Sequence, residues 1–395
     1  MLRLAICLAI VAPLLAGCGV SQRGKEMREQ AYSRMDRVNA GLLNEQATTA
    51  FETGQLDKAM DLADQAVDRF PKGPAHHVLR GRILMERDRL AEAERSLREA
   101  IELDEEQANA HYFLGIVFER LSRDDLAHEH FSTASELEPD RLQFLTASIE
   151  SLMAQGKLNE AEGMIDGRFD DFEHNAALHH LHGQIMVMRG DGQQAVSSYE
   201  MASLLAPDDP DLLGELARLR HRENDPAGVL ACLDELRRLH GQVPGLDLQL
   251  LEARAYSEMG RQADARIAYQ RVVDAHPDRL ACWREFGLFA WHIEDWRSVG
   301  RCGRRLEAAG DNSVRTRLFL AVAAREDGDL DGARSTLQGI LVDQPDNTMA
   351  STLLAGVCLR QGDSSAAKKA WQVVVKSGPS GADETRVTGV LGTRP

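Results

Sequence analysis

One order of apolar and small positions repeats along most of the chain. Residues 108–141 show it most clearly, at Leu114, Gly115, Phe118, Ala127, Phe131, Ala134 and Pro139. No segment shows the strict alternation of apolar and polar residues that indicates a half-buried β-strand. The pattern therefore favours an all-α chain, and its recurrence favours a repeat architecture over separate domains.

This order resembles the tetratricopeptide repeat, whose unit is about 34 residues long. Steps of that length place repeat starts at Ala40, Pro74, Ala108, Leu142, Ala176 and Pro210 and, after a two-residue insertion, at Leu246, Leu280, Val314 and Thr348. The signature alanine of the family then falls on Ala59, Ala93, Ala127, Ala161, Ala195, Ala265, Ala333 and Ala367, with Val229 and Val299 as departures. The resemblance predicts a right-handed solenoid of about ten helix-turn-helix repeats.

Helix packing explains the small residues. A glycine such as Gly115 or Gly183 keeps the first helix of a repeat slim where the second helix crosses it, and the signature alanine faces the same contact. A bulky side chain there would overpack the contact at a cost of about 1–3 kcal/mol. Glycines such as Gly54 and Gly156 fall at the turn between the two helices, where a left-handed residue is expected.

Two repeats depart from the pattern. The fourth has Ile149 at the glycine position and Arg168 at the second alanine position, and the sixth has Pro226 inside its turn. The insertion, within residues 240–245, follows directly. We expect bends at these places and a division of the repeats near residue 243.

The N-terminal residues follow a different pattern, one charge and then an apolar run. Arg3 precedes apolar residues 4–15, which are too few to span a bilayer, since a spanning helix needs about 20 residues. The sequence Leu15-Ala16-Gly17-Cys18 then resembles the bacterial lipobox. The resemblance implies that the Cys18 thiol is acylated and the chain cut before it, and Gly19 favours the outer membrane. The alternative is a signal segment with an incidental cysteine.

These features predict five segments and limit the partners. The segments are a lipoprotein signal peptide (1–17), a lipidated cysteine and tether (18–39), repeats one to six (40–243), repeats seven to ten (244–379) and a disordered tail (380–395). The formal net charge is −16, and an acidic surface opposes non-specific binding to nucleic acid. We expect the chain to attach to the membrane through the lipid on Cys18.

Two clusters of residues could carry chemistry. The histidines are His174, His179, His180 and His182, and the tryptophans are Trp283, Trp291 and Trp296. No HExxH motif occurs, and no carboxylate is placed to complete a metal site with His179 and His182. Trp283 falls on a packing position of the family. Trp291 falls on the face that lines the family's groove, where core packing and partner binding both stay open.

The cysteines of the repeats offer no site either. Cys232, Cys282, Cys302 and Cys358 lack a CxxC motif or other metal-ligand spacing. We therefore predict a chain that is not an enzyme, with no catalytic residue, metal or cofactor. The alternative is an enzyme or glycan-processing subunit, for peptidoglycan or exopolysaccharide, that uses the histidine and tryptophan clusters.

The family resemblance also implies a binding surface, because stacked repeats present a concave face to peptides or proteins. The family's groove positions in the last five repeats hold Arg218, Arg222, Arg254, Arg284, Arg315, Arg325 and Arg360, beside Trp291. Arginine forms planar, paired hydrogen bonds with carboxylates, so these residues fit an acidic segment of a partner. The alternative is that they pair with neighbouring acids such as Asp247 and Glu258.

The sequence thus predicts a lipid-anchored scaffold that binds protein or peptide partners in the bacterial envelope. It would face the periplasm or the cell surface and assemble or stabilise an outer-membrane or cell-wall complex. Lipobox, tether and repeats follow the plan of pilotin-like lipoproteins of type IV pili.

Overall fold

The computed structural model describes residues 22–168, 174–241 and 244–377. Within these residues the regular structure is helical and no strand occurs, which confirms the predicted all-α class. The predicted signal peptide, Cys18 and the predicted tail lie outside the described residues. Contacts between residues divide the chain after Asp191 into two compact units, called unit 1 and unit 2 below.

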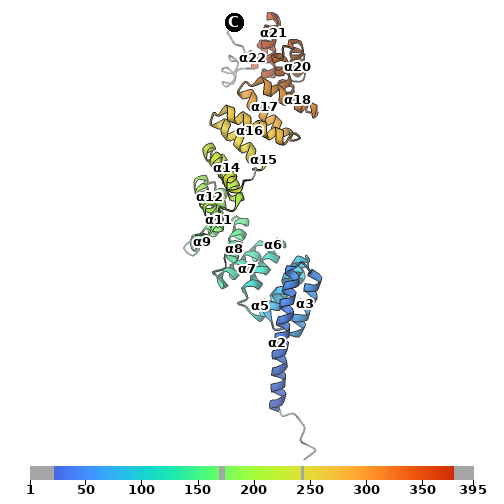
Figure 1. The fold of residues 1–395 in the computed structure, drawn as a ribbon, viewed down its shortest axis with the longest axis vertical. Helices are drawn as coiled ribbons and strands as arrows, with labels where there is room; N and C mark the ends of the chain where they lie inside the picture. The colour runs from blue at the N-terminus through green and yellow to red at the C-terminus, as the bar shows by residue number, and fades with distance from the viewer. Residues whose placement is uncertain (1–21, 169–173, 242–243, 378–395) are drawn as a thin grey trace, which may run out of the picture. The chain divides into compact units, whose positions relative to one another are not determined.

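Figure 1 labels most of the helices of both units. The described helices of unit 1 are α2 (Gln22–Glu52), α3 (Leu56–Arg69), α4 (Pro74–Glu86), α5 (Leu90–Leu103), α6 (Ala108–Arg120), α7 (Asp124–Leu137), α8 (Leu142–Ala154), α9 (Leu158–Asp166) and α11 (Ala176–Arg189). Those of unit 2 are α12 (Gly192–Leu205), α13 (Pro210–Arg222), α14 (Pro226–His240), α15 (Leu246–Glu258), α16 (Gln262–Ala275), α17 (Leu280–His292), α18 (Trp296–Ala308), α19 (Val314–Glu326), α20 (Leu330–Asp343), α21 (Thr348–Arg360) and α22 (Ser364–Ser377).

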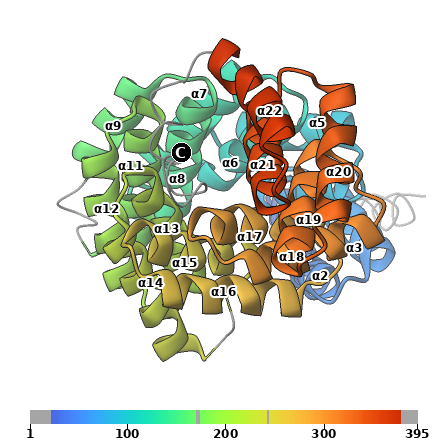
Figure 2. The same ribbon diagram turned by 90° about the horizontal axis from the view of Figure 1, so that it is seen from above.

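Consecutive helices pack as pairs, and each pair is one repeat. Helix α4 packs on α5 and α6 on α7 in unit 1, as α13 packs on α14 and α15 on α16 in unit 2. First helices also contact the first helix of the next repeat, as α2 contacts α4 and α13 contacts α15. In Figure 2, α13, α15 and α17 follow one another on one side of unit 2, with α14 and α16 on the other. The surface made by the first helices is called the first-helix face below.

The predicted register is confirmed. All nine predicted starts from Pro74 to Thr348 are the first residue of a helix, and Ala40 lies inside α2. The signature alanines from Ala59 to Ala333 are each at most 1% exposed, and Val229 and Val299 are fully buried in their place. Small side chains therefore set the closest helix contacts, as the sequence indicates.

Each repeat places one residue in the left-handed backbone region at its turn. Six are glycines, with φ from 71° to 86°: Gly54, Gly156, Gly190, Gly260, Gly328 and Gly362. The other four are Asp88, Ser122, Asn224 and Glu294, with φ from 55° to 58°. Such a backbone costs roughly 1–2 kcal/mol for a residue with a Cβ. Packing of the two helices therefore fixes the turn even where glycine is absent.

The two irregular repeats keep the plan in different ways. Helix α9 of the fourth repeat has nine residues, whereas α7 has 14. Arg168, just beyond α9, donates to the carbonyl of Pro139 at 2.6 Å. In the sixth repeat Pro226 is the first residue of α14, where no backbone N–H is needed, and the Asp225 carboxylate caps the Gly228 N–H at 2.9 Å. The proline therefore starts a helix.

The structure adds detail at two segments of the sequence-based division. Helices α14 and α15, on either side of residue 243, pack against each other, and α13 also contacts α15. The boundary between the units lies instead in the turn between α11 and α12. Residues 22–39, within the predicted tether, are helical and continuous with the first helix of the first repeat.

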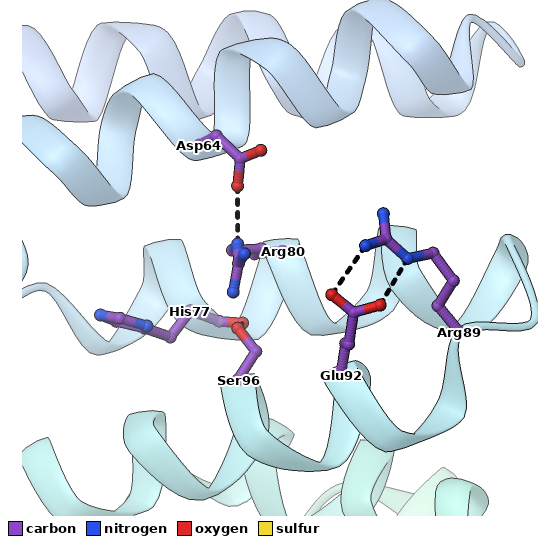
Figure 3. A network of polar contacts seen from close by, with 6 residues as sticks. All are labelled: Asp64, His77, Arg80, Arg89, Glu92 and Ser96. Carbon is purple, nitrogen blue, oxygen red and sulfur yellow. Dashed lines mark hydrogen bonds and ion pairs between the residues drawn. The ribbon is translucent and has the colours of Figure 1, made fainter.

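Polar contacts join the helices around the second repeat (Figure 3). Arg80 of α4 donates from Nε to Asp64 of α3 at 2.7 Å. The Ser96 hydroxyl of α5, 2% exposed, donates to the carbonyl of His77 in α4 at 3.0 Å. At the start of α5, Arg89 holds Glu92 through two bonds of 2.7 Å. The buried hydroxyl is thus satisfied, which avoids the cost of an unpaired polar group.

Candidate partner-binding surfaces

Two of the predicted groove arginines of unit 2 form paired hydrogen bonds with an acid of the next repeat. Arg218 of α13 donates from Nε and Nη2 to Asp247 of α15, at 2.9 and 2.7 Å. Arg254 of α15 donates from the same two atoms to Glu285 of α17, at 2.7 Å each. The hydrogen bond to Glu285 raises the pKa of Arg254. These two arginines therefore join neighbouring repeats.

Arg284 pairs with an acid at the end of its own repeat. Its Nε donates to Asp311, just before α19, at 2.9 Å. The Asp311 side chain is 8% exposed. Hydrogen bonds from Ser313, with a further one from Arg284, lower the pKa of Asp311 to about 2. Asp311 thus stays ionised as the partner of Arg284.

Arg325 is not a surface residue. Its side chain is 6% exposed, its Nε donates to Glu326 at 3.0 Å, and its guanidinium lies 5.3 Å from the ring centroid of Trp296. Arg360 lies 3.6 Å from the same Glu326 carboxylate. The alternative of internal pairing therefore describes five of the seven arginines.

Arg222 and Arg315 differ from the other five. Both are exposed. Within the described residues, neither has an acidic group within the 4.0 Å of an ion pair. They lie on different first helices, α13 and α19, so they do not form one cluster.

The aromatic and histidine clusters are largely parts of the packing. Trp283 is 5% exposed and its Nε1 donates to the carbonyl of Pro277 at 2.9 Å, so its core role is confirmed. Trp291 is partly buried against the core of unit 2, with its ring 5.6 Å from that of Trp296. His179 is 8% exposed, and burial lowers the pKa of His182. Among the described residues no group of three or more ligand side chains is placed to hold a metal ion.

The four cysteines of the repeats are buried thiols. Cys232, Cys282, Cys302 and Cys358 are free and at most 4% exposed. Burial raises the pKa of Cys232 to about 11 and that of Cys302 to about 12. A thiol held protonated in a core is unreactive, so these residues serve packing.

Unit 1 presents a first-helix face of another kind. The guanidinium of Arg82 in α4 lies 5.2 Å from the ring centroid of Phe51 in α2 and 4.8 Å from that of Phe113 in α6. All three side chains are partly exposed. Within the described chain no carboxylate lies within ion-pair distance of Arg82. Two aromatic rings from the repeats on either side therefore hold an arginine whose charge is not neutralised by an acid.

Apolar side chains extend this face beyond Phe113. Tyr112 and Ile116 of α6 and Ala147 of α8 are partly buried against the core of unit 1. The Tyr112 ring lies 5.2 Å from Phe113, and its hydroxyl accepts a hydrogen bond from Gln143 of α8 at 2.8 Å. The result is a rigid aromatic surface beside Arg82. We call Phe51, Arg82, Tyr112, Phe113 and Ile116 the aromatic patch.

Acidic side chains lie beyond the patch. Glu119 of α6 and Glu150 of α8 are both exposed. Partial desolvation, together with the charge of Glu119, raises the pKa of Glu150. The first-helix face of unit 1 therefore carries a cation on α4 and carboxylates on α6 and α8.

Known protein families match several parts of the chain. Two models, both described as tetratricopeptide repeat, match residues 44–104, 78–140 and 305–382 and residues 247–279. Together with the register of helices and turns, these matches decide the family. The chain is built from tetratricopeptide repeats. This confirms the family predicted from the signature residues.

A curated relative is the Superkiller complex protein 3 of Mus musculus. It is 32% identical over 264 residues, which is 66% of this chain, and the chain spans only 15% of that protein's length. Among solved structures, pilF of Pseudomonas aeruginosa has 20% identity and a TM-score of 0.42, and covers 52% of this chain with 93% of its own. A tetratricopeptide repeat protein of Parabacteroides merdae has 16% identity and a TM-score of 0.44, and covers 63% with 97% of its own.

Tetratricopeptide repeats bind protein or peptide partners, and the faces of the stacked helices provide the surface. The described helices include none that is both long and apolar enough to cross a bilayer. The aromatic patch is therefore a candidate surface for a protein segment.

The sequence held the signal for the aromatic patch. The groove positions that gave the arginines of the last five repeats give Phe51, Arg82, Tyr112 and Ile116 in the first three, and Phe113 is the neighbour of Tyr112. A count of basic residues alone favours unit 2 as the partner-binding surface. The missing information was which arginine has an acid from the next repeat within reach.

Proposed function

We propose that this chain is a lipid-anchored scaffold of the bacterial envelope that binds a protein segment on the first-helix face of unit 1. Anchored through Cys18, it would help to assemble or stabilise a complex at the outer membrane or cell wall. The repeats support a role in protein binding. The lipobox resemblance supports the anchor and the location.

The position of Arg82 between two rings carries this proposal. A cation stacked on aromatic faces is oriented but keeps its hydrogen-bond donors for a ligand. The rings of Phe113 and Tyr112 beside it bury area with little loss of side-chain freedom, which makes aromatic residues good binding anchors. A segment with an acidic side chain next to a large apolar one fits this chemistry.

The first-helix face of unit 2 suits this role less well. An acidic segment would have to displace Asp247 or Glu285 from arginines that they already hold. Exchanging one carboxylate for another gains little free energy. Accessible charge and accessible aromatic surface coincide at Arg82 instead.

Selection of displayed random peptides on the purified chain tests the binding site. We expect enriched peptides with an acidic residue beside an aromatic or branched one, and weaker binding at higher salt. Arg82→Met should weaken a selected peptide by about tenfold or more, because a charge-assisted contact contributes about 1.5–3 kcal/mol. The matched control is Arg218→Met, which removes the same charge from the same repeat position of unit 2. Equal affinity for wild type and a folded Arg82→Met chain would contradict the proposal.

Expression of Cys18→Ala in a bacterium tests the anchor. We expect the precursor to stay unprocessed or the chain to leave the outer-membrane fraction, because the thiol is the acylated group. Membrane fractionation with mass spectrometry of the N-terminal peptide measures both. Normal maturation and fractionation of this variant would refute the lipobox assignment and leave the peptide site untouched.

A further inference from the structure

The first part of α2 lies outside the packed repeats. Figure 1 shows the start of this helix extending beyond the other helices of unit 1. The buried residues of α2 are Ala40, Ala47 and Ala50, all in its second part. None of residues 22–39 is buried. An isolated helix of this length is marginal in water, so a surface that binds it would stabilise it.

Apolar side chains form one stripe along this segment. Met27 is 64% exposed, Met35 55%, Val38 64% and Leu42 51%. At 3.6 residues per turn they fall, with the exposed Ala31, within about a quarter of the helix circumference. Large apolar residues seldom share one exposed face without a partner.

The charges are arranged around this stripe. At the same helical spacing, Arg23 and Arg34 border one edge of the stripe and Arg28 the other. The acids Glu26, Glu29 and Asp36 fall on the opposite side of the helix. Asp36 is partly exposed and the other five are exposed, and no ion pair joins any of the six to another residue that the structure describes.

The segment also differs in charge from the rest of the chain. Residues 22–39 hold five basic and three acidic side chains, whereas the whole chain has a formal net charge of −16. The helix has basic residues at both edges of an apolar stripe and acids on its opposite side. This arrangement suits a surface with an apolar interior and a negatively charged outer layer. Anionic lipid headgroups over acyl chains have this arrangement.

The charge pattern disfavours a second copy of the chain as the occupant. Two such helices packed stripe to stripe would place arginines against arginines at both edges. The acids that could neutralise them point away from the contact. Like charges facing each other across a helix pair are destabilising.

We propose that residues 22–39 lie on an anionic membrane surface as an interfacial helix, with Met27, Met35 and Val38 inserted and the three arginines among the headgroups. This proposal rests on the envelope location proposed above, but it does not require the lipid on Cys18. It gives the segment next to the anchor a binding role of its own.

Vesicle cosedimentation of the unlipidated chain tests this. The sample is residues 18–395 with Cys18→Ser, which retains all described residues. We expect binding to vesicles of phosphatidylglycerol and phosphatidylethanolamine, weaker binding as salt rises, and little binding to phosphatidylcholine. Equal binding to both vesicle types, or to neither, would overturn the proposal.

Matched variants locate the contact. Met35→Glu should weaken binding by about tenfold or more, because it puts a charge into the stripe. Arg28→Gln with Arg34→Gln should weaken it to a similar extent, since each basic residue near an anionic surface contributes about a factor of five. Ser33→Glu, on the opposite side, adds the same charge as Met35→Glu and should change binding by less than about threefold. Equal loss from Met35→Glu and Ser33→Glu would show non-specific charge repulsion instead.

Two further outcomes separate this proposal from its alternatives. A dimer in solution that Met35→Glu dissociates would assign the stripe to a second copy. Binding to an acidic amphipathic peptide with none to anionic vesicles would assign it to a protein helix. Either result leaves the lipobox assignment standing if Cys18→Ala still mislocalises the chain. Conversely, a mature wild-type chain whose Cys18 carries no acyl chain in mass spectrometry, together with vesicle binding, would refute the anchor and keep the interfacial helix.

Discussion

Arg82 in unit 1 and Arg254 in unit 2 occupy the same position of their repeats, eight residues after the first residue of the first helix. Arg82 lies between the rings of Phe51 and Phe113. Arg254 is held by the carboxylate of Glu285. The repeat therefore fixes where a side chain points, and residues from the neighbouring repeats decide whether it stabilises the stack or remains available to a partner.

Among these variants, Arg325→Glu should cause the largest loss of stability, because Arg325 is an internal arginine of unit 2. The buried guanidinium would be replaced by a carboxylate next to Glu326, and breaking a buried pair costs about 3–5 kcal/mol. Chemical denaturation followed by circular dichroism measures the loss. Arg315→Glu, exposed on the same helix, is the control and should change stability by less than about 0.5 kcal/mol. Similar values for the two variants would mean that Arg325 is not internal.

Arg254→Met and Arg82→Met replace arginines at the same repeat position in the two units, so their losses of stability can be compared directly. Arg254→Met leaves Glu285, 27% exposed, with the Tyr269 hydroxyl as its one side-chain donor among the described residues. We expect a loss of about 1–2 kcal/mol in the free energy of unfolding. Arg82→Met keeps an unbranched side chain between two rings, where a thioether packs well, so the loss should stay below about 1 kcal/mol. The same denaturation experiment measures both. The reverse order would contradict the assigned roles.

Acidification should give the smallest of the expected effects, a difference in stability between unit 1 and unit 2. Burial, helped by the charge of His111, lowers the pKa of His130 to about 4, and burial lowers the pKa values of His76, His111, His128 and His182. All five residues belong to unit 1. The unfolded chain takes up these protons near pH 6.5, while the folded chain resists protonation. The stability of unit 1 is therefore complete above about pH 6.5 and falls toward pH 4, by a modest amount because the rings are partly solvated.

Hydrogen exchange with mass spectrometry checks this prediction. After correction for intrinsic exchange rates, peptides of unit 1 should lose protection between pH 7 and pH 5 before those of unit 2. His130→Gln should reduce the difference, because it removes the histidine whose pKa burial lowers to about 4. Earlier loss in unit 2 would run against the histidine assignment.

The repeat register was predictable because it depends on local residue types. Signature alanines such as Ala127 and the first residues of the helices follow from spacing along the chain. Turn residues were predictable only in part, since Glu294 and Ser122 adopt the left-handed conformation without being glycine. Helix packing on both sides imposes that conformation, and no local sequence rule contains it.

The candidate site was less predictable, because it depends on contacts between repeats. The partner of Arg218 lies 29 residues along the chain and that of Arg254 lies 31. A shift of one helical turn in the stacking would separate these pairs. The choice between internal pairing and partner binding therefore requires the stacking geometry.

The ion pairs of unit 2 also have a consequence for how the molecule melts. In a linear array, cooperativity depends on the free energy of the interfaces between neighbouring repeats relative to that of each repeat. Arg218–Asp247 and Arg254–Glu285 cross such interfaces and involve partly exposed arginines. Dissolved salt weakens exposed charge pairs and has less effect on the apolar contacts inside each repeat. Rising ionic strength should therefore broaden the melting transition of unit 2, so that its repeats unfold increasingly one by one.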